Sequence, residues 1–180
     1  MNRFLVALSA AASLLLLAPG PAHAVGPAPC VRGESESKSR SSVDEGEIRY
    51  TDSSQYDVDI KHAIAAWQYS GARIKILGDT ASTVNDLDFT DFDDPENTAA
   101  GIWSYNAEPA WTDYIRFNKA KMKGYSPKKR RSVAAHELGH ALGLCHKDFN
   151  TTYSLMWPQV QEDYDVPQAV DKANYKKLWG

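Results

Sequence analysis

Apolar side chains recur at helical spacing in three segments of the chain, and each segment carries a helix start or stop signal. The segments are residues 56–71, which end in a glycine, residues 126–143, which open with Ser-Pro, and residues 167–180, which open with Pro. Serine before proline is typical of a helix cap followed by its first turn, and a glycine commonly ends a helix. The apolar face of the first segment consists of Ile60, Ala63, Ile64 and Trp67. We therefore predict three helices.

Shorter segments alternate apolar and polar side chains, as strands with one buried face do. They are residues 48–52, 73–77, 86–92, 101–105 and 114–118. The order is strand, helix, several strands, helix, loop and helix. This order predicts an α+β domain with a sheet of about five strands.

The first 24 residues have the layout of a secretory signal peptide. Arg3 gives a short basic start, an apolar run covers residues 4–18, and small residues at Ala22 and Ala24 mark a cleavage site. The apolar run is shorter than the roughly 20 residues of a spanning helix, which favours export over a membrane anchor. We expect cleavage after Ala24 and a secreted, extracellular protein.

Composition divides the remaining chain into a lead-in and one domain. Residues 25–47 are rich in Pro, Gly, Ser and charge, which predicts an irregular lead-in with order beginning near Ile48. Residues 48–180 suit a single core, and we expect a monomer. A formal net charge of −3 at pH 7 gives no reason to expect a nucleic-acid partner, and we expect no membrane partner.

Three of the five histidines lie in HELGHALGLCH, residues 136–146. His136 and His140 are four positions apart, so on a helix both project from one face. A continuing helix would turn His146 away, but Gly143 can end the helix in the left-handed conformation and return His146 to the same point. The spacing therefore predicts a metal site with three imidazole ligands.

Three neutral imidazoles with an open fourth position are typical of catalytic zinc, whereas structural zinc has four protein ligands. Zinc would lower the pKa of a water in the open position toward ~7, and Glu137 would take its proton as general base before attack on a carbonyl carbon. A bare HExxH also occurs on ordinary helix surfaces. Gly143 and His146 in register favour the metal site.

The extended motif resembles that of the metzincin metallopeptidases, and SLMWP at residues 154–158 resembles the methionine turn of their matrixin branch, which includes the matrix metalloproteases. The closing sequence is also similar to the matrixin C-terminal helix, with Asp171 and Trp179-Gly180 in the matching places. The resemblance implies a zincin-like fold with a small mixed sheet, a first long helix, an active-site helix and a closing helix. It further implies that Met156 forms an apolar floor beneath the zinc and that Asp171 is structural.

The resemblance extends weakly to residues 97–105, NTAAGIWSY, which are similar to the matrixin segment entering an edge strand. Because an edge strand has unpaired N–H and C=O groups, an extended protein or peptide substrate can pair with it. We expect residues 101–105 to line the cleft, an inner strand being the alternative. Residues 157–166 are expected to form a wall of the pocket for the side chain after the cut.

The chain departs from the matrixin pattern in its other metals. Matrixins carry a second, structural zinc bound by additional histidines, but after residue 24 only His62 lies outside the motif, so we expect no second zinc. The acidic stretch at residues 86–96 could supply oxygen ligands to Ca²⁺. A solvated acidic loop is the alternative.

Cys30 and Cys145 are the two cysteines of the chain, and an even number in an exported protein favours a disulfide. The matrixin resemblance offers an alternative, because residues 29–33, PCVRG, contain the residue types of the matrixin latency switch in a different order. In that switch a propeptide cysteine blocks the zinc. The lead-in is too short for a folded prodomain, and we favour the disulfide.

The favoured function is a secreted zinc-dependent endopeptidase, with His136, His140 and His146 as zinc ligands and Glu137 as the catalytic base. One alternative is a catalytically silent zinc-binding interaction module, although a site kept only for binding needs no Glu137. The other is a zinc amidase acting on a non-protein substrate, which would use the same motif chemistry. The sequence does not indicate the preferred substrate or the route of activation.

Overall fold

The computed structural model describes residues 25–107, 112–149, 153–159 and 161–180, so the predicted signal peptide lies outside the described residues. Within these ranges, no helix is long and apolar enough to cross a membrane. The strands are β1 (Glu47–Asp52), β2 (Lys75–Gly78), β3 (Leu87–Phe92), β4 (Gly101–Ser104) and β5 (Asp113–Asn118). The helices are α1 (Asp57–Trp67), α2 (Lys119–Met122), α3 (Pro127–Ala141) and α4 (Ala169–Trp179).

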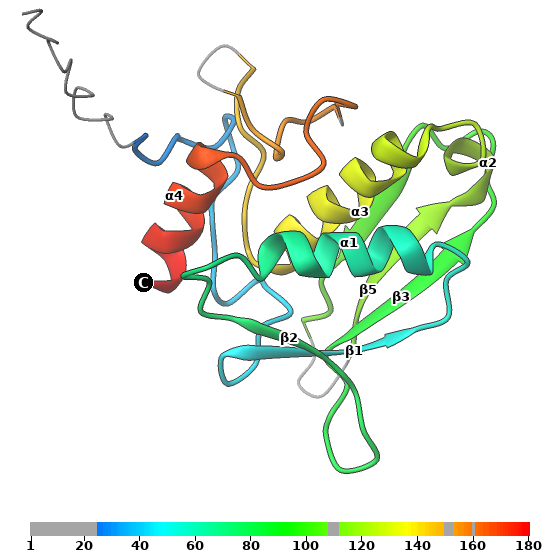
Figure 1. Ribbon diagram of the computed structural model, residues 1–180, viewed down its shortest axis with the longest axis horizontal. Helices are drawn as coiled ribbons and strands as arrows, with labels where there is room; N and C mark the ends of the chain where they lie inside the picture. The colour runs from blue at the N-terminus through cyan, green and yellow to red at the C-terminus, as the bar shows by residue number, and fades with distance from the viewer. Residues whose placement is uncertain (1–24, 108–111, 150–152, 160) are drawn as a thin grey trace, which may run out of the picture.

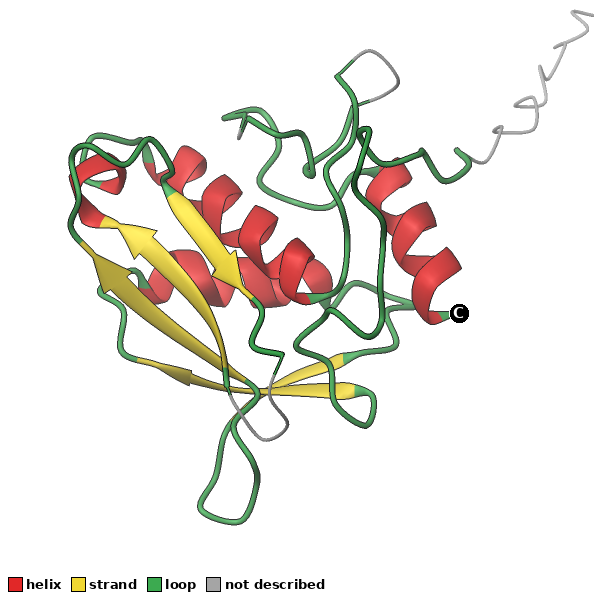
Figure 2. Cartoon of the chain, turned by 180° about the vertical axis from the view of Figure 1, so that it is seen from behind, coloured by secondary structure: helices red, strands yellow, loops and turns green. Residues whose placement is uncertain are grey.

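The five strands form one sheet in the order β2-β1-β3-β5-β4. β4 runs antiparallel to β5, and the other neighbouring strands are parallel. α1 and α3 pack together on one face of the sheet, and α4 lies at one end of the domain beside the C-terminus (Figures 1 and 2). The predicted α+β domain with a mixed, five-stranded sheet is confirmed.

Side-chain alternation explains which face of the sheet the helices cover. In β5, Ile115 and Phe117 are fully buried, whereas Tyr114 and Arg116, which alternate with them, are exposed, as the period of two requires. α1 buries the predicted apolar positions Ile60, Ala63, Ile64 and Trp67. The core therefore lies between the sheet and the α1–α3 pair.

β4 lies at the edge of the sheet, because β5 is its one neighbour among the described strands. This position confirms the prediction of an edge strand over the inner-strand alternative. α3 packs directly against β4. The free edge of β4 is thereby brought beside the helix that carries HELGH.

One short helix, α2, was not predicted from the sequence. It follows β5 without a connecting loop, and the Asn118 side chain caps it by accepting a hydrogen bond from the Ala120 N–H at 3.1 Å. A four-residue helix is too short to show a helical period. The first helix also ends at Trp67, before the predicted stop at Gly71.

The lead-in, residues 25–46, forms no helix or strand, yet it is fixed along the domain. Backbone N–H groups of Ser37 and Ser42 donate to the carbonyls of Gly143 and Ala141, at 3.0 and 2.8 Å. The Ser42 hydroxyl is buried and donates to Asp113 at 2.6 Å. Order therefore begins well before Ile48, contrary to the prediction. Polar contacts, rather than burial of apolar side chains, hold this segment against the domain.

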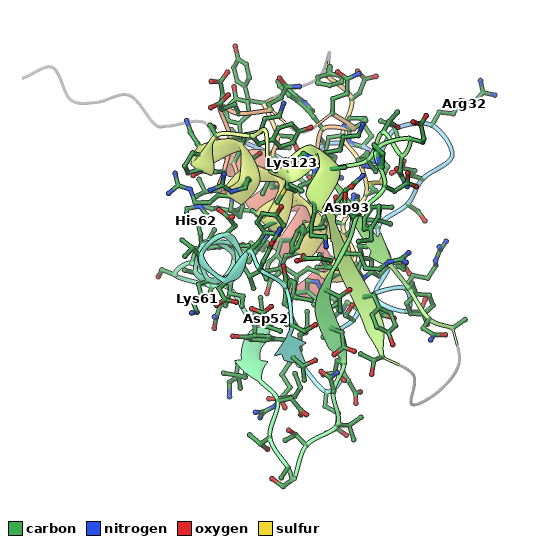
Figure 3. The ribbon with its side chains drawn as sticks, turned by 90° about the vertical axis from the view of Figure 1, so that its right-hand side faces the viewer. Arg32, Asp52, Lys61, His62, Asp93 and Lys123 are labelled. Carbon is green, nitrogen blue, oxygen red and sulfur yellow. A yellow bond between two sulfur atoms is a disulfide. The ribbon has the colours of Figure 1, made fainter. Side chains whose placement is uncertain are left out.

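A disulfide joins Cys30 of the lead-in to Cys145, with a Cα–Cα distance of 5.6 Å and a sequence separation of 115 residues. The predicted disulfide is confirmed. The alternative, in which Cys30 blocks the zinc as a thiolate, is wrong, because its sulfur is bonded to Cys145. Arg32, which would belong to such a switch, extends outward from the molecule (Figure 3).

Candidate active site

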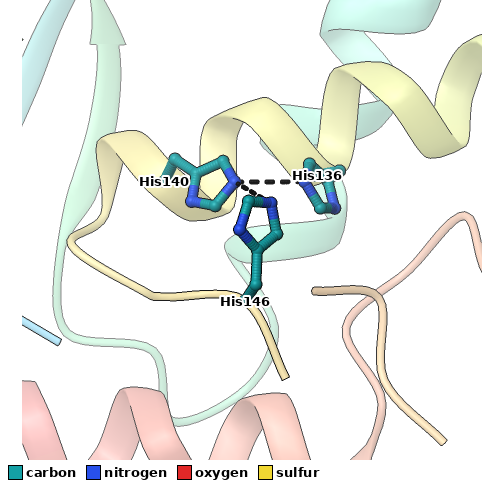
Figure 4. Close-up of side chains that lie close together, drawn as sticks. All are labelled: His136, His140 and His146. Carbon is teal, nitrogen blue, oxygen red and sulfur yellow. Dashed lines mark hydrogen bonds between the residues drawn. The ribbon is translucent and has the colours of Figure 1, made fainter. Parts of the chain in front are cut away.

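Three histidine rings converge at the end of α3 (Figure 4). The Nε2 atom of His140 lies 3.1 Å from the Nε2 atoms of both His136 and His146. All three ligand atoms lie within 4.8 Å of one another. His136 and His140 come from successive turns of α3, whereas His146 comes from the chain beyond its end. The structure thus brings together the three histidines that the motif singled out.

Hydrogen bonds at the opposite ring nitrogens define the tautomers. The Nδ1–H groups of His136 and His140 donate to the carbonyls of Leu155 and Leu144, at 2.9 and 2.8 Å. The Nδ1–H of His146 donates to a carboxylate oxygen of Glu34 at 2.9 Å. Since a neutral imidazole carries one N–H, each Nε2 is left with an unprotonated lone pair facing the common centre.

Three lone pairs this close to one another fit a cation. Nitrogens bound at about 2.0–2.1 Å to a tetrahedral zinc lie about 3.3 Å apart, near the spacing seen here. Burial lowers the pKa of His136 well below its ordinary value, and burial followed by repulsion from His146 lowers the pKa of His140 to about 4. Both imidazoles are therefore neutral at physiological pH, as metal ligands must be. The donor set fits zinc.

The end of α3 sets the path to His146. Gly143 has φ +81°, its N–H donates to the His140 carbonyl at 2.8 Å, and the Leu144 N–H donates to the Gly139 carbonyl at 3.0 Å. These two bonds form a Schellman motif, which turns the chain back across the helix end. The predicted bend at Gly143 is therefore confirmed.

Gly143→Ala is expected to destabilise the protein more than the same change at Gly71. Both glycines have positive φ, so alanine at either strains the backbone by about 1–3 kcal/mol. A Cβ at Gly143 would also overlap the Ser37 carbonyl, whereas Gly71 faces open space. Urea unfolding of the two variants measures the difference. Equal losses would show that the contact between the helix end and the lead-in does not contribute.

The turn containing Met156 supports the first histidine. Asp171, which is fully buried, accepts hydrogen bonds from the backbone N–H of Leu155 at 2.8 Å and from the Ser154 hydroxyl. The Leu155 carbonyl in turn accepts the ring N–H of His136. Met156 is fully buried, and its sulfur packs against Gly139 so closely that a Cβ there would overlap it. Asp171 thus stabilises the turn that holds Leu155 and Met156 in position.

Glu137 lies beside the histidines on the buried face of α3, with 6% of its surface exposed. Burial raises the pKa of its carboxyl to about 7, although a hydrogen bond from the Trp103 N–H acts to lower it. That N–H belongs to the edge strand β4 and lies 2.9 Å from Glu137 Oε2. A carboxylate with a pKa near 7 suits proton transfer at neutral pH.

A cleft of about 860 Å³ opens over these groups. Its walls are the segment that enters and includes β4 on one side and the chain after the methionine turn on the other, with His136, Glu137, His140 and His146 at its base. A smaller pocket of about 340 Å³ adjoins it, shares Trp103, His140 and His146, and is lined on its far side by the lead-in. Of the predicted residues 101–105, residues 101–103 line the cleft, whereas Ser104 and Tyr105 do not. Pro158, Gln159 and Gln161 from the expected wall also line it.

His62, the remaining histidine after residue 24, and two carboxylates of the acidic stretch have protein partners. His62 lies on α1 (Figure 3), with its Nε2 2.8 Å from the Asp165 carbonyl oxygen. In the acidic stretch, Asp86 accepts a hydrogen bond from the Arg49 backbone N–H, and Asp91 accepts one from the Ser54 hydroxyl. Both carboxylates therefore already have a donor within the protein. Among the described residues, the histidine triad is the one group of three or more candidate ligands.

Two contacts of the site were not found from the sequence. One is the backbone N–H of Trp103, which no side-chain pattern marks. The other is Glu34. Its partial burial is the largest single influence and acts to raise the pKa of its carboxyl, but two hydrogen bonds from His146 and attraction to the histidines together hold that pKa below its ordinary value. The disulfide was the available signal for Glu34, because a lead-in tied at Cys30 brings the following residues near His146.

An α+β domain with three converging imidazoles and an adjacent glutamate at the base of a cleft defines a metal-dependent hydrolase site. The family model described as Matrixin matches residues 41–180. Because this match covers most of the chain, the protein belongs to the matrixin family of zinc metallopeptidases. A search of curated proteins found none that matches the chain.

Proposed function

We propose that this protein is a secreted zinc-dependent endopeptidase in which His136, His140 and His146 hold one zinc ion and Glu137 is the general base. The family supports the zinc peptidase class. The observation that carries the proposal is the convergence of three histidine Nε2 atoms beside a buried carboxylate in one open cleft. A structural zinc would need a fourth protein ligand, and the triad has none among the described residues.

When bound, zinc would supply Lewis acidity that lowers the pKa of a water and polarises the scissile carbonyl. Glu137 accepts the proton of the attacking water at its carboxylate and then donates it to the departing amine nitrogen. The Trp103 N–H, bonded to one carboxylate oxygen, fixes the orientation of Glu137 and leaves the other oxygen for this transfer. The burial that raises the pKa of Glu137 strengthens it as a base.

The edge strand β4 supports a protein or peptide substrate bound in extended form. β5 occupies one side of β4, and the other side borders the cleft. The Trp103 N–H on that side is bonded to Glu137, and the remaining N–H and C=O groups there can pair with an extended chain, which would then cross above Glu137. This geometry favours an endopeptidase over an amidase for small non-protein substrates, because the cleft follows the chain from Thr98 to Trp103.

Export and monomeric state belong to the same proposal. The predicted signal peptide at residues 1–24 directs the chain to an oxidising compartment, and the Cys30–Cys145 disulfide is stable in such a compartment. A single core and a cleft formed within one chain need no second copy.

The proposal predicts that a zinc chelator abolishes cleavage of an unfolded protein or peptide library, because the histidines alone cannot activate water. The matched sample is the same protein with the chelator already saturated by zinc, which should retain full activity. Cleavage that survives metal removal would exclude a zinc peptidase. Zinc binding without cleavage would instead favour the silent binding module.

A further inference from the structure

His146 is held differently from the other two proposed zinc ligands. His136 and His140 belong to α3, and their ring N–H groups donate to backbone carbonyls. His146 lies beyond the helix end, with 27% of its side chain exposed, and its ring is bonded to the Glu34 carboxylate. Neither a regular helix nor burial fixes this ring, so its orientation depends on that contact.

The Glu34 carboxylate holds both the ring and the main chain of His146. Oε1 accepts the ring Nδ1–H at 2.9 Å, and Oε2 accepts the backbone N–H at 2.8 Å. Two hydrogen bonds to one planar carboxylate fix the orientation of the His146 ring relative to the His146 backbone. Because Glu34 bonds Nδ1, it lies across the ring from Nε2 and is not itself placed as a ligand.

Glu34 belongs to a segment whose first residues, beginning at the disulfide, are fixed to the chain around His146. We call residues 30–37 the strap. Cys30 is bonded to Cys145, and the Val31 N–H donates to the His146 carbonyl at 3.0 Å. Glu34 is therefore held within a few residues of one direct link to His146 and one link to the preceding residue, Cys145.

The other end of the strap is fixed by polar contacts. Glu36 accepts hydrogen bonds from the ammonium of Lys147, which is fully buried, and from the Asn174 side chain, at 2.6 and 2.5 Å. The Ser37 N–H donates to the Gly143 carbonyl at 3.0 Å. Because both ends of the strap are anchored, the position of Glu34 does not depend on its own bonds to His146.

We propose that Glu34 is a positioning residue for the zinc site, which orients His146 and fixes its Nε2 lone pair toward the metal. The inference rests on the proposed zinc function and adds to it a residue outside the matched family region, residues 41–180. A carboxylate that accepts the distal N–H of a metal-bound histidine fixes its tautomer and raises its basicity, and losing such a partner typically weakens metal binding about 10–100-fold. The strap thereby contributes to the metal site from the lead-in.

The test is the affinity for Zn²⁺ alone, measured by competition with a chelating indicator on the disulfide-bonded protein. Glu34→Ala is expected to bind Zn²⁺ about 10–100-fold more weakly than wild type. Glu34→Gln is expected to recover part of this loss, because an amide oxygen still accepts the ring N–H without the charge. Partial rescue by glutamine distinguishes a positioning role from a general loss of packing.

Glu36→Gln is the matched control, because it removes the charge of a second strap carboxylate that contacts no histidine. It is expected to lower the unfolding midpoint while changing zinc affinity less than about threefold. That change is well below the loss expected when a zinc-binding histidine loses its hydrogen-bond partner. Equal zinc affinity of Glu34→Ala and wild type would overturn the inference, and so would an equal loss in Glu36→Gln. If wild type itself binds no Zn²⁺, the proposed function fails, and the inference fails with it.

Discussion

Glu137→Gln is expected to lower kcat/KM for peptide cleavage by about 10²–10⁴-fold, the usual contribution of general acid–base catalysis. Glutamine keeps the size of the side chain and can still accept the Trp103 N–H that now bonds to Oε2. It cannot take up the proton of water at neutral pH. The loss should therefore appear in kcat, with little change in KM.

Zinc content and a fluorogenic peptide assay on the same preparations test this prediction. Glu137→Gln should bind one zinc per chain, as wild type should, because the three histidines are unchanged. Glu45→Gln is a suitable control, since Glu45 is exposed and lies outside the cleft, and it should retain full activity. Cleavage by Glu137→Gln within a few-fold of wild type would assign the base to another group.

Removal of the Cys30–Cys145 disulfide is expected to lower the free energy of unfolding by about 2–5 kcal/mol, the usual range for a native disulfide in a small secreted domain. The bond closes a long loop, with 115 residues separating the two cysteines. Its loss also frees the strap next to His146. Zinc affinity should therefore fall together with stability.

Urea unfolding of the double variant Cys30→Ala/Cys145→Ala, compared with wild type with and without reductant, measures this effect. Reduced wild type should resemble the double variant, and reductant should leave the double variant unchanged. The fully buried Lys147 ammonium lies 3.0 Å from the Cys145 sulfur, so alanine rather than a charged residue is the appropriate substitution. A stability change below about 0.5 kcal/mol, the size of an ordinary surface substitution, would mean that polar contacts alone hold the lead-in.

The helix period made much of the site predictable. It placed His136, Glu137 and His140 on α3, because their spacing in the sequence determines their direction around the helix. Gly143 could be identified as the bend, because glycine adopts the left-handed conformation that ends a helix more readily than other residues do. Local rules of this kind need no knowledge of the rest of the fold.

Contacts between distant segments were not predictable in the same way. Glu34 and His146 are 112 positions apart, and no local pattern in the lead-in indicates that partner. The Trp103 contact uses a backbone N–H that every non-proline residue carries, so the sequence of β4 does not distinguish it. The polar composition of the lead-in predicted an irregular segment with order beginning near Ile48. The segment is irregular, but hydrogen bonds and a disulfide, which composition does not indicate, order it from further upstream.

The most direct test of the central claim is a zinc titration of metal-free protein, with the rate of peptide cleavage as the measurement. If His136, His140 and His146 form one catalytic zinc site, activity should rise linearly and reach its plateau at one equivalent of zinc per chain. Protein that binds one equivalent and cleaves no peptide, or that is fully active before zinc is added, would contradict this account.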